Sequence, residues 1–126
     1  MTNFEKVAEF MTAFGQDVET VPTWSNKAEL RYHLIEEELK ELRDAMNEKD
    51  IVEIADALTD LLYVVYGAGH SFGINLDNCF DEVHSSNMTK LGPEGKPIYR
   101  EDGKVMKGPK YRKPNLRSVL NLTLNP

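Results

Sequence analysis

Residues Leu34–Gly67 decide the fold of this chain. They read LIEEELKEL at residues 34–42, NEKD at residues 47–50 and IVEIADALTDLLYVVYG at residues 51–67. In both longer runs the apolar residues recur every three or four positions, which indicates helices. The polar NEKD break is long enough for a helix–helix connection. The stretch therefore predicts two helices that face each other.

On the first of these helices, two glutamates occupy positions that normally hold core leucines. At about 100° per residue, Glu38 and Glu41 fall in the same arc as Leu34, and Glu36 points outward. A solvated face is the ordinary explanation of glutamate-rich helices, and it suits Glu36. It suits Glu38 and Glu41 less well, because the helix has a more polar side available.

The second helix is apolar around most of its circumference, which predicts burial nearly all round. One narrow stripe is acidic and contains Glu53, Asp56 and Asp60, and no Lys or Arg occurs between residues 49 and 90. Buried carboxylates without such partners are protonated or bound to metal. Oxygen-only ligands on facing helices suit Mg²⁺ or Mn²⁺.

These residues resemble a known family. EELKE at residues 37–41 followed by EIAD at residues 53–56 is similar to the EExxE…ExxD signature of MazG-like, all-α nucleoside triphosphate pyrophosphohydrolases. DLLY at residues 60–63 resembles the end of this motif in phosphoribosyl-ATP pyrophosphohydrolases. The resemblance continues through EVHSSNMTK at residues 82–90 and extends to dimeric dUTPase- and dCTPase-type enzymes.

The ligands on the second helix stay open at this point. Only eleven residues separate Glu41 from Glu53, which is short for the signature. The pair could be Glu53 with Asp56, or Asp56 with Asp60. Asp50 and Glu53 also fit a capping box, which would assign Glu53 to the start of the helix. The acids of both alternatives share one face, so either pair meets the first helix.

The resemblance implies hydrolysis of a nucleoside triphosphate at the α-phosphorus, giving a monophosphate and pyrophosphate. A bound Mg²⁺, with Mn²⁺ as a substitute, would lower the pKa of a water molecule. Glu37, at the edge of the ligand arc, is the candidate general base. The expected catalytic set is Glu37, Glu38 and Lys90. The expected metal ligands are Glu38, Glu41, Asp56 and either Glu53 or Asp60.

Substrate contacts are expected from two further places. The resemblance implies that Gln16 and Trp24 approach the nucleobase, whereas a core or interface aromatic is the ordinary explanation of Trp24. Asn87 and Lys90 lie near the end of a fourth predicted helix. A terminal lysine there usually interacts with the helix dipole, but the resemblance implies contact with the substrate. Lys90 and Arg112 are expected to stabilise the leaving pyrophosphate.

Length and composition set the wider frame. A chain of 126 residues predicts one domain, over residues 1–115, with a tail over residues 116–126. We expect an all-α antiparallel bundle of four to five helices. A short β-hairpin is expected near Ile98–Lys107, because Asp102 and Gly103 stand between alternating runs.

Charge and cysteine content bear on partners and compartment. The net charge of −6 argues against nucleic-acid binding, although nine of the fifteen basic residues fall between Lys90 and Arg117. No apolar run is long enough for a membrane span, and the single Cys79 fits a reducing cytoplasm. The chain is expected to bind a nucleoside triphosphate in the deoxynucleotide form. It is also expected to form a homodimer or homotetramer that covers its apolar helix.

Overall fold

The computed structural model describes residues 1–122 and confirms an all-α fold. Within that range the helices are α1 (Asn3–Ala13), α2 (Ala28–Glu48), α3 (Ile51–Ser71), α4 (Leu76–Met88), a 3-10 helix (Pro93–Gly95) and α5 (Leu116–Val119). The chain divides into two compact units, one ending at Leu76 and one beginning at Asp77. The final residues of the expected tail, 123–126, lie outside the described range. Among the described helices, none has the length and apolarity to cross a membrane.

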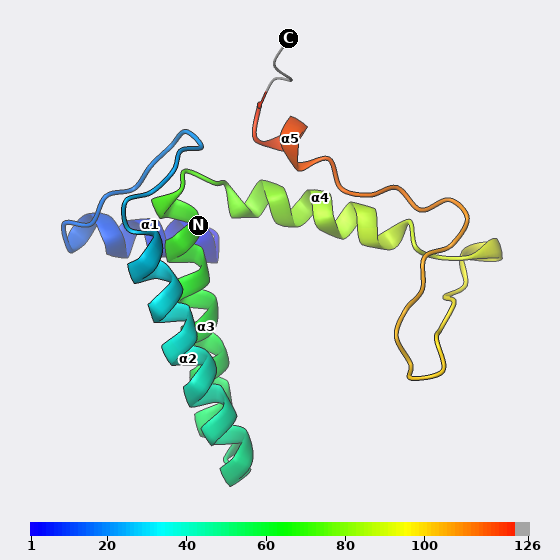
Figure 1. Cartoon of the computed structure of the whole chain (residues 1–126), viewed down its shortest axis with the longest axis horizontal. Coiled ribbons are helices and arrows are strands. Elements are labelled where there is room, and N and C mark those ends of the chain that lie inside the picture. Colours follow the sequence, from blue (N-terminus) through cyan, green and yellow to red (C-terminus); the bar gives the residue numbers. More distant parts are fainter. Residues whose placement is uncertain (123–126) are drawn as a thin grey trace. The chain divides into compact units, whose positions relative to one another are not determined.

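The first unit is built on the antiparallel pair of α2 and α3, which run side by side (Figure 1). A tight connection joins them, with Lys49 in the left-handed conformation at a φ of 56°. The Asp50 carboxylate accepts hydrogen bonds from the N–H groups of Val52 and Glu53, at 3.1 and 3.2 Å. The N–H of Asp50 donates to the carbonyl of Ala45. Asp50 therefore caps α3 alone, and the Glu53 carboxylate is left for other contacts.

Helix α1 packs on the C-terminal turns of α3. Phe4, Val7 and Met11 are buried, as their helical spacing requires. The Phe4 ring stacks on the His70 ring with centroids 3.8 Å apart, and His70 Nε2 lies 2.8 Å from the Phe4 carbonyl oxygen. These contacts fix the start of α1 against the end of α3.

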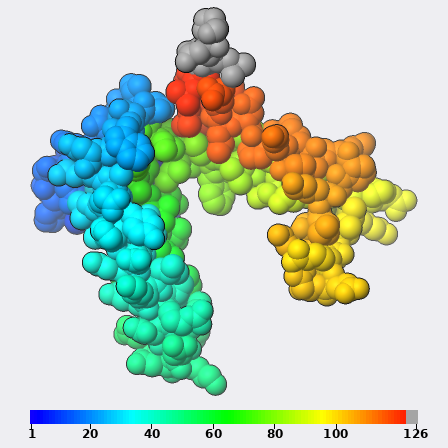
Figure 2. All heavy atoms as spheres, viewed as in Figure 1, coloured from blue at the N-terminus to red at the C-terminus, as the bar shows by residue number. Residues whose placement is uncertain are grey.

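The prediction that α3 is buried nearly all round is wrong for the single chain. Helix α1 covers only the last turns of α3, so its other turns keep an apolar face exposed. In Figure 2 the residues of α2 lie nearest the viewer, those of α3 lie behind them, and no other segment covers α2. The exposed apolar side chains of α3 are Ile51, Val52, Leu58, Leu62, Tyr63 and Val65.

The predicted β-hairpin of the second unit is reduced to a turn. A single antiparallel bridge joins Tyr99 and Val105, and no strand forms in the described chain. The N–H of Arg100 donates to the Lys104 carbonyl at 2.8 Å, and Arg100 pairs with Asp102 across the turn. Residues 93–107 are all exposed. The hairpin prediction is therefore wrong: a turn forms at Asp102 and Gly103, but two isolated flanking strands are only marginally stable and do not form.

Gly73, which follows α3, tests how closely the connection after α1 is packed. Its φ is +65°, and a Cβ there would lie 2.1 Å from the Val21 carbonyl oxygen. We expect Gly73→Ala to lower the free energy of unfolding by about 3 kcal/mol, from backbone strain plus overpacking. Gly15→Ala is the control, because Gly15 has a φ of +74° but nothing within 4 Å. Urea denaturation of both variants measures the difference, and equal losses would contradict this packing.

Candidate metal centre

Three carboxylates from α2 and α3 meet in the first unit. Glu38 and Glu41 come from α2 and Asp60 from α3, and one oxygen of each lies within 4.8 Å of the others. Glu38 and Asp60 are half-buried, and Glu41 is exposed. The inward arc predicted for α2 therefore exists, and it places two of its glutamates against the acidic stripe of α3.

The electrostatics of this cluster are unfavourable without a cation. Oε2 of Glu38 is buried and has no hydrogen-bond partner among residues 1–122. Burial, then a hydrogen bond and the charge of Glu41, then the charges of Asp60 and Glu37, raise the pKa of Glu38 to about 7. Burial, followed by the charges of Asp56 and Glu41, also raises the pKa of Asp60. An unpaired buried oxygen among carboxylates fits a hard divalent cation.

The remaining acids of the predicted ligand set lie beside this cluster. Glu53 and Asp56 line a groove of about 360 Å³ together with Glu41. Both are exposed, whereas Asp60 joins Glu38 and Glu41 directly. Glu37 is exposed, and its charge acts on Glu38. Glu41 thus borders both acidic groups, and the choice between Glu53 and Asp60 as ligand stays a prediction.

Arg31 is a residue that the sequence reasoning missed. It is buried on α2, and its Nε donates to Ser71 Oγ at 2.8 Å. Its Nη2 donates to Gln16 Oε1 at 3.2 Å, and burial lowers the pKa of its guanidinium. Arg31 lies seven residues before Glu38 and so on the same helical face. A charged residue on the inward arc was the available signal, as it was for the glutamates.

Gln16 and Trp24 line the same cavity. This cavity of about 590 Å³ is lined by Gln16, Trp24 and Arg31, among others. Trp24 is 81% exposed and makes one edge-on ring contact with Phe72, at 5.5 Å between centroids. Within the described chain, the core explanation of Trp24 is therefore wrong, and most of its ring is accessible to a ligand.

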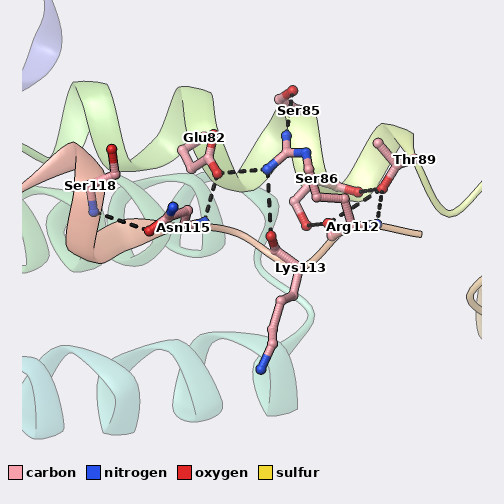
Figure 3. A network of polar contacts seen from close by, with 8 residues as sticks. All are labelled: Glu82, Ser85, Ser86, Thr89, Arg112, Lys113, Asn115 and Ser118. Carbon is pink, nitrogen blue, oxygen red and sulfur yellow. Dashed lines mark hydrogen bonds and ion pairs between the residues drawn. The ribbon is translucent and has the colours of Figure 1, made fainter. Parts of the chain in front are cut away.

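In the second unit, Arg112 already has protein partners. Its Nη1 lies 2.8 Å from Glu82 Oε2, and its Nη2 donates to Ser85 Oγ at 3.0 Å. Glu82 also accepts from the N–H of Asn115 at 2.7 Å (Figure 3). This network fastens the segment after Tyr111 to α4, and a substrate contact by Arg112 would have to share or replace these bonds.

Asn87 and Lys90 lie at the end of α4. Asn87 is exposed in the last turn, and Lys90 is half-buried just beyond it. The N–H of Lys90 donates to the Asn87 carbonyl at 3.0 Å, and the Lys90 carbonyl accepts from Gly108 at 2.8 Å. The backbone thus holds the two residues close together, with Lys90 just beyond the helix, and their role toward a substrate stays a prediction.

The sequence pattern of one known family, described as phosphoribosyl-ATP pyrophosphohydrolase, matches residues 7–87. The chain belongs to this family. An uncharacterized protein of Acanthamoeba polyphaga mimivirus is similar to it, with 40% identity over 114 residues that cover 84% of this chain. The chain spans 42% of that viral protein's length.

The description of this family names a pyrophosphohydrolase. The acidic cluster of Glu38, Glu41 and Asp60 agrees with membership, because enzymes of this family typically use a divalent metal. The matched residues 7–87 include this cluster and the Arg31–Gln16 contact, so both belong to the part of the chain that carries the family's pattern.

The raised pKa of Glu38 predicts how pH affects the metal-free protein. The folded state holds the proton of the Glu38 carboxyl more tightly than the unfolded state does. The free energy of unfolding is therefore greatest below the unfolded pKa of 4.5, and it falls as pH rises toward about 7. Thermal denaturation in chelator should show this decrease, and Mg²⁺ should restore stability more at pH 8 than at pH 5. Glu38→Gln should flatten the pH dependence, and an unchanged profile in this variant would contradict the assignment.

Proposed function

We propose that this chain is a metal-dependent nucleoside triphosphate pyrophosphohydrolase that converts a (d)NTP to a (d)NMP and pyrophosphate. The observation that carries the proposal is the cluster of Glu38, Glu41 and Asp60 on facing helices, with a buried Glu38 oxygen that lacks a partner. Such a cluster holds a hard cation, and the triphosphate is the part of the substrate that hard cations bind. Family membership supports cleavage of a phosphoanhydride.

In this proposal the oxygens of Glu38, Glu41 and Asp60 would hold Mg²⁺, with Mn²⁺ as a substitute, and Asp56 and Glu53 border the same site through Glu41. Such a cation would supply neutralisation of phosphate charge and a more acidic bound water. The water oxygen forms a bond to the α-phosphorus while the bond from this phosphorus to the bridging oxygen breaks. Glu37 takes the water's proton, and pyrophosphate leaves with the bridging oxygen.

Lys90 and Arg112 are the cations proposed for the leaving pyrophosphate. Together with Asn87 they belong to the basic second unit, which contains nine of the fifteen Lys and Arg residues of the chain. Arg112 would exchange its bond to Glu82 for a phosphate oxygen, since a guanidinium binds both anions with the same geometry.

Phosphoribosyl-ATP is the second candidate substrate, because the matching family pattern carries that description. Its hydrolysis breaks the same kind of bond, between the α- and β-phosphates. The acidic cluster serves both substrates equally, so the two candidates differ in what the rest of the site binds.

Pyrophosphate release with Mg²⁺ and a panel of nucleoside triphosphates plus phosphoribosyl-ATP tests the proposal. Glu38→Gln should lower kcat/KM by more than about a hundredfold, because removing even an outer-sphere partner of a metal costs ten- to a hundredfold. Glu29→Gln is the matched control on the same helix, where the side chain is 90% exposed. Chelation should abolish activity in the wild type.

The products decide between the possibilities. Monophosphate plus pyrophosphate supports attack at the α-phosphorus, and diphosphate plus free phosphate would refute it. Turnover of phosphoribosyl-ATP alone would favour the second substrate. A folded protein that turns over no substrate and shows no effect of Glu38→Gln on metal binding would indicate a non-catalytic module.

We also propose that a second copy of the chain covers the exposed face of α3, in a homodimer or homotetramer. Leu58 and Leu62 are 44% and 54% exposed there, beside Ile51 and Val52 at 76% and 71%. Exposed apolar side chains along a helix whose other face carries the acidic stripe are typical of subunit contacts.

Sedimentation velocity tests this assembly. Leu62→Lys should shift the protein toward the monomer, because the charge would be buried in the contact without a partner. Tyr99→Lys is the control, since Tyr99 is 62% exposed in the turn of the second unit. A monomeric wild type, or equal behaviour of the two variants, would refute the proposal.

A further inference from the structure

Helix α2 carries an apolar stripe that stays exposed in the single chain. Tyr32, Leu39 and Met46 follow one another at intervals of seven residues, and they are 61%, 55% and 45% exposed. Seven residues are close to two helical turns, so the three side chains lie in one line along the helix. Half-buried Ile35 and buried Leu42 occupy the positions between them. Together these residues have the spacing of a coiled-coil seam.

One flank of this stripe carries an acid and a base that are also seven residues apart. These are Glu36 and Arg43, which therefore lie on the same side of the helix. Arg43 is exposed and makes no ion pair or hydrogen bond within residues 1–122. The Glu36 carboxylate has Oε1 3.7 Å from Nδ1 of His33, and this contact is an ion pair only when the imidazole is protonated. Both flank charges are thus available to a partner.

The two flank charges are complementary to the same two charges in reverse order. The midpoint between Glu36 and Arg43 falls beside Leu39, close to the middle of α2. If a second α2 crosses this point in the antiparallel direction, Glu36 of each copy meets Arg43 of the other. A parallel pair would instead place like charges opposite each other, which is repulsive. The charge pattern therefore favours an antiparallel pair of identical helices.

We propose that α2 pairs antiparallel with α2 of a second copy, about a two-fold axis at Leu39. The exposed apolar stripe forms the centre of this contact, and two symmetry-related pairs of Glu36 with Arg43 form its flank. The partner is a second copy because the stripe is complementary to itself, a property that binding to an unrelated protein does not require.

The contact leaves the candidate metal centre accessible. Glu41 follows Leu39 by two positions and so lies roughly 160° around the helix from it. The inference does not depend on the proposed activity. It also concerns another helix than the α3 contact proposed above, so the two contacts are tested by different variants.

Charge reversal tests the pairing without changing the helix core. Glu36→Lys gives a chain with two positive flank charges, and Arg43→Glu gives a chain with two negative ones. Each variant alone should associate at least about tenfold more weakly than the wild type, because two attractive pairs become repulsive. An equal mixture of the two variants should recover wild-type association, and so should the double variant Glu36→Lys/Arg43→Glu. Sedimentation velocity over a dilution series measures these changes.

Native mass spectrometry of the mixture measures the choice of partner, whatever other contacts hold the assembly. Mixed assemblies of the two variants should exceed assemblies of like chains by about tenfold relative to random mixing. Wild type mixed with Asp44→Lys is the control, because this variant has the same charge change as Glu36→Lys. Asp44 lines the acidic groove, roughly 140° around α2 from Leu39, so these chains should mix at random.

Three results would overturn the inference. These are a monomeric wild type, random mixing of the two charge variants, and wild-type association of each variant alone. The α3 contact fails separately: dissociation of Leu62→Lys together with random mixing of the charge variants would leave only that contact. Pyrophosphate release is measured in neither experiment, so the proposed function stands or falls independently.

Discussion

The repulsion among Glu38, Glu41 and Asp60 is the constraint on which the first unit depends. Three carboxylates share a space in which one oxygen is buried and unpaired, so the arrangement persists only if the helices that carry it are fixed by other contacts. The fixed elements are the tight connection at Asp50, which caps α3, and the α1 contacts at the opposite end of the pair. The charged middle is thus held from both ends.

Arg31 connects three parts of the first unit through the hydrogen bonds of its guanidinium. Its guanidinium links α2 to Ser71 at the end of α3 and to Gln16 in the connection after α1. The close approach to α3 exists only because residue 67 is glycine. A buried arginine bound by neutral acceptors has no carboxylate partner for its positive charge, which lowers the free energy of unfolding. The same residue therefore organises the connection and faces the cavity that contains the acids.

Much of this arrangement could be predicted from the sequence, for a specific reason. Glu38 and Glu41 occupy helix positions at which leucine is expected. Charged residues at such positions are typical of functional sites. The polar break at residues 47–50 also predicted where α2 ends and α3 begins. The sequence left Glu53 and Asp60 as alternatives, because both share one face of α3 and only the register between α2 and α3 separates them. The burial of α3 was also misjudged, since periodicity shows that a face is apolar but not what covers it.

Glu38 and Asp60 of the acidic cluster and the Arg31 guanidinium carry charges of opposite sign. All three line the cavity of about 310 Å³ in the first unit. Acids at Glu38 and Asp60 suit a cation and, through it, phosphate, whereas the donors of Arg31 and Gln16 suit neutral acceptors or an anion. Arg31 and Glu38 lie on one face of α2, so the helix fixes the separation of these two side chains. A ligand bound by both the acids and Arg31 must then be long, negatively charged at one end and rich in acceptors at the other. A nucleotide meets all three requirements, while pyrophosphate or a free base meets only part of them.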